Sequence, residues 1–169
     1  MRCCVDEKLT DKADAVMLRL RSAGLTVVTA ESCTGGLVAA CLTHGKDASS
    51  CFQGAFVAYT KQHKTQVLGV DPKLLAEAGA VNTEVALQMA EGALQRSEAT
   101  LALAITGVLG PDPDEDGNPA GLVYLALARR GRPTRVTKYD FAPSPPDSVR
   151  EQTVTQALET LQRAGEHPR

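Results

Sequence analysis

Residues 25–42 read LTVVTAESCTGGLVAACL, and this stretch determines the fold that we expect. Its first part, 25–30, is short, apolar and rich in β-branched residues, which is typical of a buried strand. Its last part, 37–42, continues apolar without a helix breaker. The polar octet between them is predicted to connect the strand to a helix, and it reads Thr29-Ala30-Glu31-Ser32-Cys33-Thr34-Gly35-Gly36. The first amides of that helix would suit an anion or a developing oxyanion.

Strands and helices alternate along the rest of the chain. Strands are expected at 52–59 and 101–105, and a β-hairpin at 122–128 and 134–141. Helices are expected at 11–23, 36–43, 61–68, 72–78, 83–95 and 147–163, with Asp71 and Asn82 as N-terminal caps. This order predicts an α/β fold, a three-layer α/β/α sandwich around a mostly parallel five-stranded mixed sheet. One strand of the C-terminal hairpin should be antiparallel.

Length and composition limit the classes of protein that fit. The 169 residues are 43% hydrophobic, which suits a single domain over residues 1–169 with one buried core. The net charge is −2 and the basic residues are dispersed along the sequence, which argues against direct contact with nucleic acid. No apolar run approaches the ~20 residues of a membrane span, and the N-terminus lacks the apolar core of a signal peptide. We therefore expect a cytoplasmic protein without a membrane partner.

The cysteines do not indicate a metal site or a disulfide framework. They number five and form no C-x-x-C pair, which favours reduced thiols. We expect no metal and no other cofactor.

Polar residues follow three predicted strands at the edge where an open parallel sheet binds its ligands. Ser32 follows the first, Tyr59 and Lys64 follow the second, and Thr106 with Gly107 follow the third. A serine hydroxyl is a weak nucleophile near neutral pH, and a partly desolvated lysine can act as its base. Ser32 and Lys64 are therefore a candidate catalytic pair, with Tyr59 placed to relay or orient the proton.

Structural roles compete with this interpretation. A serine at a strand-to-helix turn is about as often a helix cap as a nucleophile. Lys64 and Arg150 are also compatible with ordinary surface charges, and Cys33 with a small packed side chain. The residues alone leave both readings open.

Taken together and in this order, four blocks resemble the CinA C-terminal domain family. They are the octet that contains Ser32, residues 52–70, residues 79–93, and the segment 105–121 with its Thr-Gly and Gly-Pro pairs. The resemblance extends over about 9–161. Single-domain members of the family include amidohydrolases that act on nicotinamide mononucleotide.

The resemblance implies hydrolysis of the carboxamide of nicotinamide mononucleotide, in pyridine nucleotide salvage, without metal. It implies Ser32 as nucleophile, Lys64 as base and Tyr59 beside them, and it suggests a homo-oligomer, most simply a dimer. We expect the substrate to be bound by further residues of the strand ends, and Arg150 to contact its phosphate. These substrate-binding candidates are Glu31, Cys33, Thr34, Gly35, Gly36, Thr106 and Gly107.

Two segments depart from the family pattern. The family usually has Ser-Asn where this chain has Thr60-Lys61, and a Gly-Gly pair where residues 112–117 are acidic and rich in proline. Such a loop can repel a phosphate-bearing substrate. An inactive nucleotide-binding or regulatory module, linked to competence or DNA damage, is therefore the alternative. A thiol sensor at Cys33 or at Cys3-Cys4 is a third hypothesis.

Overall fold

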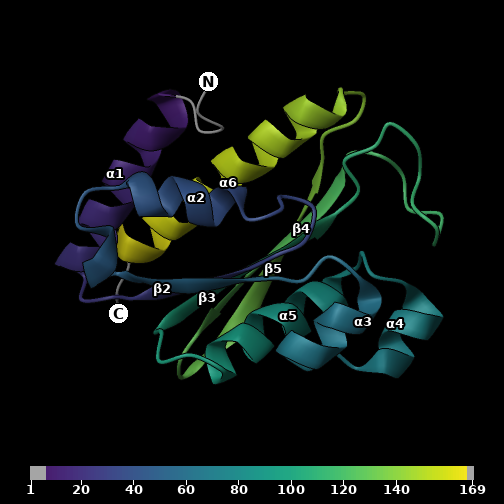
Figure 1. Cartoon of the computed structure of the whole chain (residues 1–169), viewed down its shortest axis with the longest axis horizontal. Coiled ribbons are helices and arrows are strands. Elements are labelled where there is room, and N and C mark those ends of the chain that lie inside the picture. The colour runs from purple at the N-terminus through teal and green to yellow at the C-terminus, as the bar shows by residue number, and fades with distance from the viewer. Residues whose placement is uncertain (1–6, 167–169) are drawn as a thin grey trace.

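The computed structural model describes residues 7–166, which form one five-stranded sheet with helices on both faces (Figure 1). The strands are β1 (Val27–Glu31), β2 (Phe52–Val57), β3 (Leu101–Gly107), β4 (Leu122–Arg129) and β5 (Arg132–Asp140), in the order β2-β1-β3-β4-β5. β1 pairs in parallel with β2 and β3, and β4 pairs antiparallel with β3 and β5. Only β4 runs against the others, so the predicted mixed sheet is confirmed.

The helices divide between the two faces of the sheet. α1 (Glu7–Ser22), α2 (Leu37–His44) and α6 (Pro146–Glu166) cover one face, while α3 (Lys61–His63), α4 (Pro72–Ala78) and α5 (Thr83–Gln95) cover the other (Figure 1). A short 3₁₀ turn, Ala48–Ser50, precedes β2. The three predicted layers are therefore present.

The two faces of the sheet carry side chains of different size. Leu101, Leu103 and Ile105 of β3 belong to the core under α1, α2 and α6. Ala102 and Ala104, which alternate with them, belong to the core under α5. Side chains of a strand alternate between faces, so the large residues fill one layer while the alanines let α5 lie close to the sheet on the other.

The predicted caps are found, and most boundaries differ by only a few residues. The side chain of Asp71 accepts a hydrogen bond from the Lys73 amide, and that of Asn82 accepts one from the Val85 amide. The predicted helix at 61–68 instead divides into α3 and one π-helical turn, Lys64–Leu68. Gly69 ends that turn in the left-handed conformation (φ 75°), and its amide reaches back to the Lys64 carbonyl.

Two further boundaries matter for the site. β3 continues to Gly107, two residues beyond the predicted end, because Thr106 and Gly107 stay paired with β4. The hairpin loop is the two-residue Arg130-Gly131, shorter than predicted, with Gly131 at φ 74°. Within residues 7–166, no helix is long and apolar enough to cross a membrane.

Candidate active site

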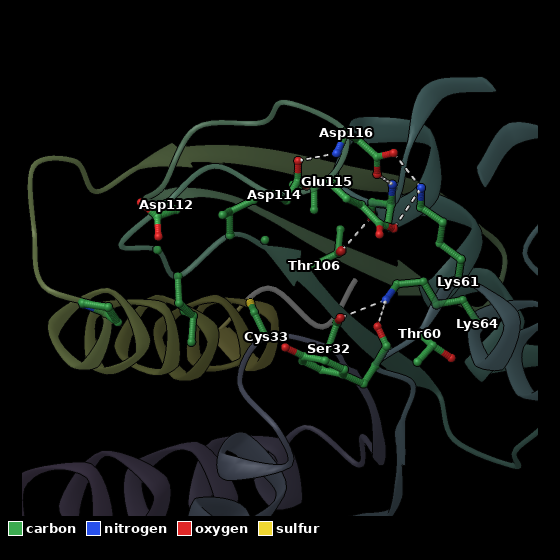
Figure 2. A pocket seen from close by; sticks show the side chains of 18 of the residues that line it. Ser32, Cys33, Thr60, Lys61, Lys64, Thr106, Asp112, Asp114, Glu115 and Asp116 are labelled. Atoms are coloured by element: carbon green, nitrogen blue, oxygen red, sulfur yellow. Dashed lines mark hydrogen bonds and ion pairs between the residues drawn. The ribbon is translucent and has the colours of Figure 1, made fainter. Parts of the chain in front are cut away.

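Ser32 and Lys64 meet at the carboxyl ends of β1 and β2. Ser32 directly follows β1, and Lys64 begins the π-helical turn. The Lys64 Nζ and the Ser32 Oγ are 2.8 Å apart, and Figure 2 shows the two side chains pointing toward one another. The sequence hypothesis required this approach, so its geometric condition is met.

The Lys64 amine lies among oxygen atoms but is shielded from solvent. Lys64 is 1% exposed, and its Nζ donates hydrogen bonds to the main-chain oxygens of Ala58 (2.9 Å) and Tyr59 (3.1 Å). Burial disfavours the charged form and lowers the pKa of Lys64 from 10.5 to about 8, although Cys33 acts weakly in the other direction. A substantial fraction of the amine is therefore neutral near physiological pH.

The two carbonyl groups also orient the neutral amine. A carbonyl oxygen only accepts hydrogen bonds, and a neutral amine has two N–H groups and one lone pair. When the two N–H groups bond Ala58 and Tyr59, the remaining tetrahedral position, which holds the lone pair, faces Ser32. The Ser32 hydroxyl then donates to Lys64, which is the arrangement of a general base and its nucleophile.

Glu31 holds the turn that carries Ser32. The Glu31 side chain is fully buried and accepts four hydrogen bonds, from the Thr29 and Thr34 hydroxyls and from the Val38 and Ala39 amides. The N-cap position of α2 is Gly36, which has no side chain to cap the helix. The carboxylate of Glu31 therefore supplies the cap from the end of β1, where it also meets the positive end of the helix dipole.

Four residues of the predicted substrate-binding set lie in this turn and outside the lining of the cavity. Glu31, Thr34, Gly35 and Gly36 do not line the cavity at Ser32, because Glu31 and Thr34 are bonded to each other inside the protein. The Gly35 amide already donates to the Ser32 carbonyl (3.1 Å). These four residues form and stabilise the strand-to-helix turn. A signal for this was present in the sequence, since two glycines at the start of α2 left its amides without a neighbouring cap.

The cavity itself has a volume of about 780 Å³, within the size range of small-molecule sites. Ser32, Cys33, Thr106, Gly107 and Arg150 are among the residues that line it, and their roles toward a substrate stay predictions. Thr106 is 1% exposed and its hydroxyl donates to the Ala80 carbonyl (2.8 Å), so it can only accept a hydrogen bond from a ligand. Arg150 donates to Asp147 on the same helix (3.0 Å).

Tyr59 contacts the candidate catalytic pair through its main-chain carbonyl oxygen, which accepts a hydrogen bond from Lys64. The residue is 74% exposed, and the hydrogen bond that Lys64 makes with it is to the carbonyl oxygen. Tyr59 lines the cavity, but over residues 7–166 no hydrogen bond joins its phenol to Ser32 or Lys64, so a proton relay through the phenol stays a prediction. The groups that orient Lys64 are the carbonyl oxygens of Ala58 and Tyr59, which residue types alone do not identify.

Cys33 is a packed thiol in this site. It is 8% exposed, and burial raises the pKa of its thiol to about 12. The positive charge of Lys64 lowers the pKa, but by less than burial raises it. A thiol with such a pKa carries little thiolate at neutral pH, which disfavours Cys33 as nucleophile or redox sensor. Cys3 and Cys4 lie outside the described residues. Over residues 7–166, no cluster of three or more His, Cys, Asp or Glu side chains is arranged to hold a metal ion.

The two segments that depart from the family pattern, Thr60-Lys61 and residues 112–117, contact each other beside the cavity that both line. Lys61 Nζ lies 2.6 Å from an Asp116 carboxylate oxygen and 3.2 Å from one of Glu115, as Figure 2 shows. The hydrogen bond with Asp116 raises the pKa of Lys61, and the same bond lowers the pKa of Asp116. Asp116 also accepts from the Ala80 amide (3.1 Å). The acidic loop is thus tied to α3 and to the segment that follows α4, and the opposite charges of Lys61 and the loop could have suggested the first of these contacts.

The open sheet, with helices on both faces and a cavity at the carboxyl ends of its parallel strands, defines a three-layer α/β protein. The family model for the CinA C-terminal domain matches residues 9–164, and the chain belongs to this family. Nicotinamide-nucleotide amidohydrolase PncC of Escherichia coli is 38% identical over 156 residues, which cover 92% of this chain and 94% of that protein.

Some similar proteins are longer than this chain, and others have a solved structure. A CinA-like protein of Geobacter sulfurreducens is 45% identical over 151 residues, 89% of this chain and 36% of that protein. The chain thus spans about a third of the length of the CinA-like proteins that it matches. The crystal structure of the competence/damage inducible protein CihA from Agrobacterium tumefaciens aligns with a TM-score of 0.90 at 37% identity, over 98% of this chain and 100% of that one.

Proposed function

We propose that this protein is a nicotinamide-nucleotide amidohydrolase, which converts nicotinamide mononucleotide to nicotinic acid mononucleotide and ammonia in pyridine nucleotide salvage. The observation that carries the proposal is the 2.8 Å contact between Lys64 Nζ and Ser32 Oγ at the wall of a cavity of about 780 Å³. The similarity to the PncC amidohydrolase over most of both chains supports the choice of substrate.

In the first half of the reaction, neutral Lys64 takes the Ser32 hydroxyl proton as the oxygen attacks the carboxamide carbon. The tetrahedral intermediate carries a negative charge on the former carbonyl oxygen, which the main-chain amide of Cys33, the next residue to line the cavity, would stabilise. The Lys64 ammonium then protonates the amide nitrogen, the C–N bond breaks, and ammonia leaves. An ester of Ser32 with the nicotinoyl group remains.

In the second half, water replaces ammonia. Lys64 takes a proton from the water as its oxygen attacks the ester carbon, and the C–O bond to Ser32 breaks. The proton passes from Lys64 to the Ser32 oxygen, and the carboxylic acid that forms loses its proton to solvent and leaves as a carboxylate. Each half of the reaction returns Lys64 to the neutral state that its burial favours.

The remaining lining residues suggest how the substrate lies. The Thr106 hydroxyl can accept a hydrogen bond from the carboxamide N–H₂ group, because its own proton is used on Ala80. Arg150 is the proposed phosphate partner, since a guanidinium matches phosphate oxygens and the residue lines the cavity. A phosphate would compete there with Asp147.

The direct test is ammonia release from nicotinamide mononucleotide by the wild type and by Ser32→Ala and Lys64→Ala. We expect both variants to lose at least about a hundredfold in kcat, because each removes a reacting group. Thr43→Ala, which changes an exposed hydroxyl on α2, is the control and should keep full activity. Equal activity of wild type and Ser32→Ala would overturn the proposal, provided that circular dichroism shows both folded.

A module that binds nucleotides without turnover is the second candidate, because the loop at 112–117 is tied across the cavity by Lys61. It predicts saturable binding of nicotinamide mononucleotide by calorimetry and no ammonia from any variant. A single domain, a cytoplasmic location and a homodimer are proposed alongside either function. Sedimentation of the purified chain tests the last of these.

A further inference from the structure

A second cavity lies at the opposite end of the sheet from Ser32. Its volume is about 730 Å³, and none of its lining residues lines the first cavity. β3 begins at Leu101, which lines the second cavity, and ends at Gly107, which lines the first. The lining of the second cavity extends along the sheet from Leu101 to Leu125, which pairs with Ile105, two residues before Gly107. The two cavities share no lining residue, so ligands bound in them would contact different side chains.

The second cavity combines an apolar floor with polar walls. The floor consists of Leu101, Leu125 and Leu127, which lie on the face of the sheet that packs against α6. One wall is the neighbouring part of β5, where Thr137 pairs with Leu125 and Arg135 with Leu127. The other wall is the last part of α6.

The walls carry an excess of positive charge. The lining includes four arginines and one carboxylate, and these are Arg129, Arg132, Arg135, Arg163 and Glu166. The expected dispersal of basic residues does not hold at this end of the molecule. Arg129 and Arg132 pair across the hairpin, and both line the cavity.

The arginines of this cavity differ from Arg130, their neighbour in sequence. Arg130 is used in the fold, since its guanidinium donates to the carbonyl groups of Leu94, Ser97 and Ala99. Over residues 7–166, neither Arg132 nor Arg135 has a carboxylate within 4.0 Å. Their guanidinium groups are available to a ligand.

We propose that this cavity binds a nucleoside polyphosphate, with its phosphates on Arg132, Arg135 and Arg163 and its base on the leucine floor. Guanidinium groups bind phosphate oxygens through paired, charge-assisted hydrogen bonds. Leu101 and Leu125 are buried, so the part of the floor that is open to a ring is Leu127, and the volume is that of a small-molecule site. Because the arginines surround one cavity and do not extend in a stripe, the geometry favours a compact nucleotide over a nucleic-acid strand. The inference does not depend on the chemistry at Ser32.

The test is calorimetric titration of the whole chain at low salt with ATP, inorganic triphosphate and adenosine. ATP should bind, and Arg135→Gln should weaken it at least about tenfold, because it removes a charge-assisted phosphate contact. Arg132→Gln should act in the same direction. Lys138→Gln is the matched control, since it removes the same charge from β5 at an exposed position outside the cavity lining, and it should stay within about twofold of the wild type. Ser32→Ala should bind ATP as the wild type does.

Three outcomes would overturn the inference. The first is equal ATP affinity in the wild type and in both arginine variants. The second is triphosphate binding as tightly as ATP, which would leave no role for the leucine floor. The third is a single-stranded oligonucleotide that binds more tightly than ATP and loses affinity in Arg135→Gln, which would assign the cavity to nucleic acid.

Discussion

Lys64 is the residue whose protonation state controls the proposed reaction. Lys64 is 1% exposed, and its amine lies within hydrogen-bonding distance of Ser32, Ala58 and Tyr59. Two of these partners are fixed main-chain acceptors, so the neutral amine has one preferred orientation, with its lone pair on Ser32. Burial thus lowers the pKa of Lys64, and the two carbonyl contacts orient the lone pair of its neutral amine toward Ser32.

The first prediction at this scale concerns pH. Because the neutral form of Lys64 is the base, kcat/KM for nicotinamide mononucleotide should rise with pH and level off above a midpoint near 8, the pKa that burial gives the amine. Initial rates of ammonia release between pH 6 and 10 measure this. A profile that is flat or falls over pH 7 to 9 would contradict a basic role for Lys64.

The same shift has a consequence for stability with a definite sign. The folded protein holds Lys64 with a pKa of about 8, and the unfolded chain with one near 10.5, so the unfolded state binds more protons between these values. The contribution of Lys64 to the free energy of unfolding should therefore rise with pH, by up to about 1.4 kcal/mol per pH unit, and it should be clearest between pH 8 and 9, because the raised pKa of Cys33 acts in the opposite direction above pH 9. Urea unfolding of wild type and Lys64→Met should show this slope only in the wild type.

Glu31 gives the second prediction, on stability. In Glu31→Gln, one accepting oxygen becomes an N–H₂ group that faces the Val38 or Ala39 amide, so buried donors lose their acceptor. We expect a loss of about 3 kcal/mol in the free energy of unfolding, with lower activity because Ser32 is the next residue. Glu77→Gln, at an exposed position on α4, should change stability by less than about 0.5 kcal/mol. Similar unfolding midpoints for the two variants would show that the cap is dispensable.

At the scale of elements, the close approach of α5 fixes the turn that carries Lys64. A Cβ atom built on Gly92 of α5 would lie 1.8 Å from the Leu68 carbonyl oxygen, at the end of the π-helical turn. The alanines that the sheet presents to α5 permit this approach. Gly92 and the alanines under α5 therefore help to position Lys64, although they are distant from it in sequence.

The third prediction follows from that contact. Gly92→Ala improves helix propensity by about 1 kcal/mol, yet its methyl group must displace main chain, so we expect a net loss of about 2 kcal/mol or more. Activity should fall as well, because the displaced Leu68 belongs to the same turn as Lys64. Gln95→Ala, exposed on the same helix, is the control. A Gly92→Ala variant more stable than the wild type would show that α5 moves away at little cost.

At the scale of the whole molecule, the sequence predicted the layers and the meeting of Ser32 with Lys64, because both depend on strand order and on the common edge where parallel strands end. It did not predict the cap by Glu31, the carbonyl contacts of Lys64 or the exposure of Tyr59. These depend on side-chain direction and on main-chain atoms, which residue types alone do not specify. Likewise, the sequence did not predict that four arginines line the second cavity, because this depends on which face of β5 lies toward α6.

The net charge of −2 conceals an uneven distribution of charge. Four carboxylates line the cavity at Ser32, those of Asp112, Asp114, Glu115 and Asp116, whereas four arginines line the cavity at the opposite end. Lys61 is held by two of the carboxylates, so its charge is compensated at the mouth of the site. A phosphate-bearing substrate therefore approaches against the field of the loop.

The last prediction uses this field and rests on the proposed function. Glu115→Gln removes one carboxylate without disturbing Asp116, and should lower KM for nicotinamide mononucleotide by about twofold to threefold, whereas Lys61→Met should raise it by a similar factor. Both changes should shrink in 0.5 M salt, because exposed charges are screened, while kcat stays nearly constant. Nicotinamide riboside, which lacks the phosphate, is the control substrate and should show smaller changes. If the two variants shift KM in the same direction, or shift it equally for both substrates, the loop acts through its shape and not through its charge.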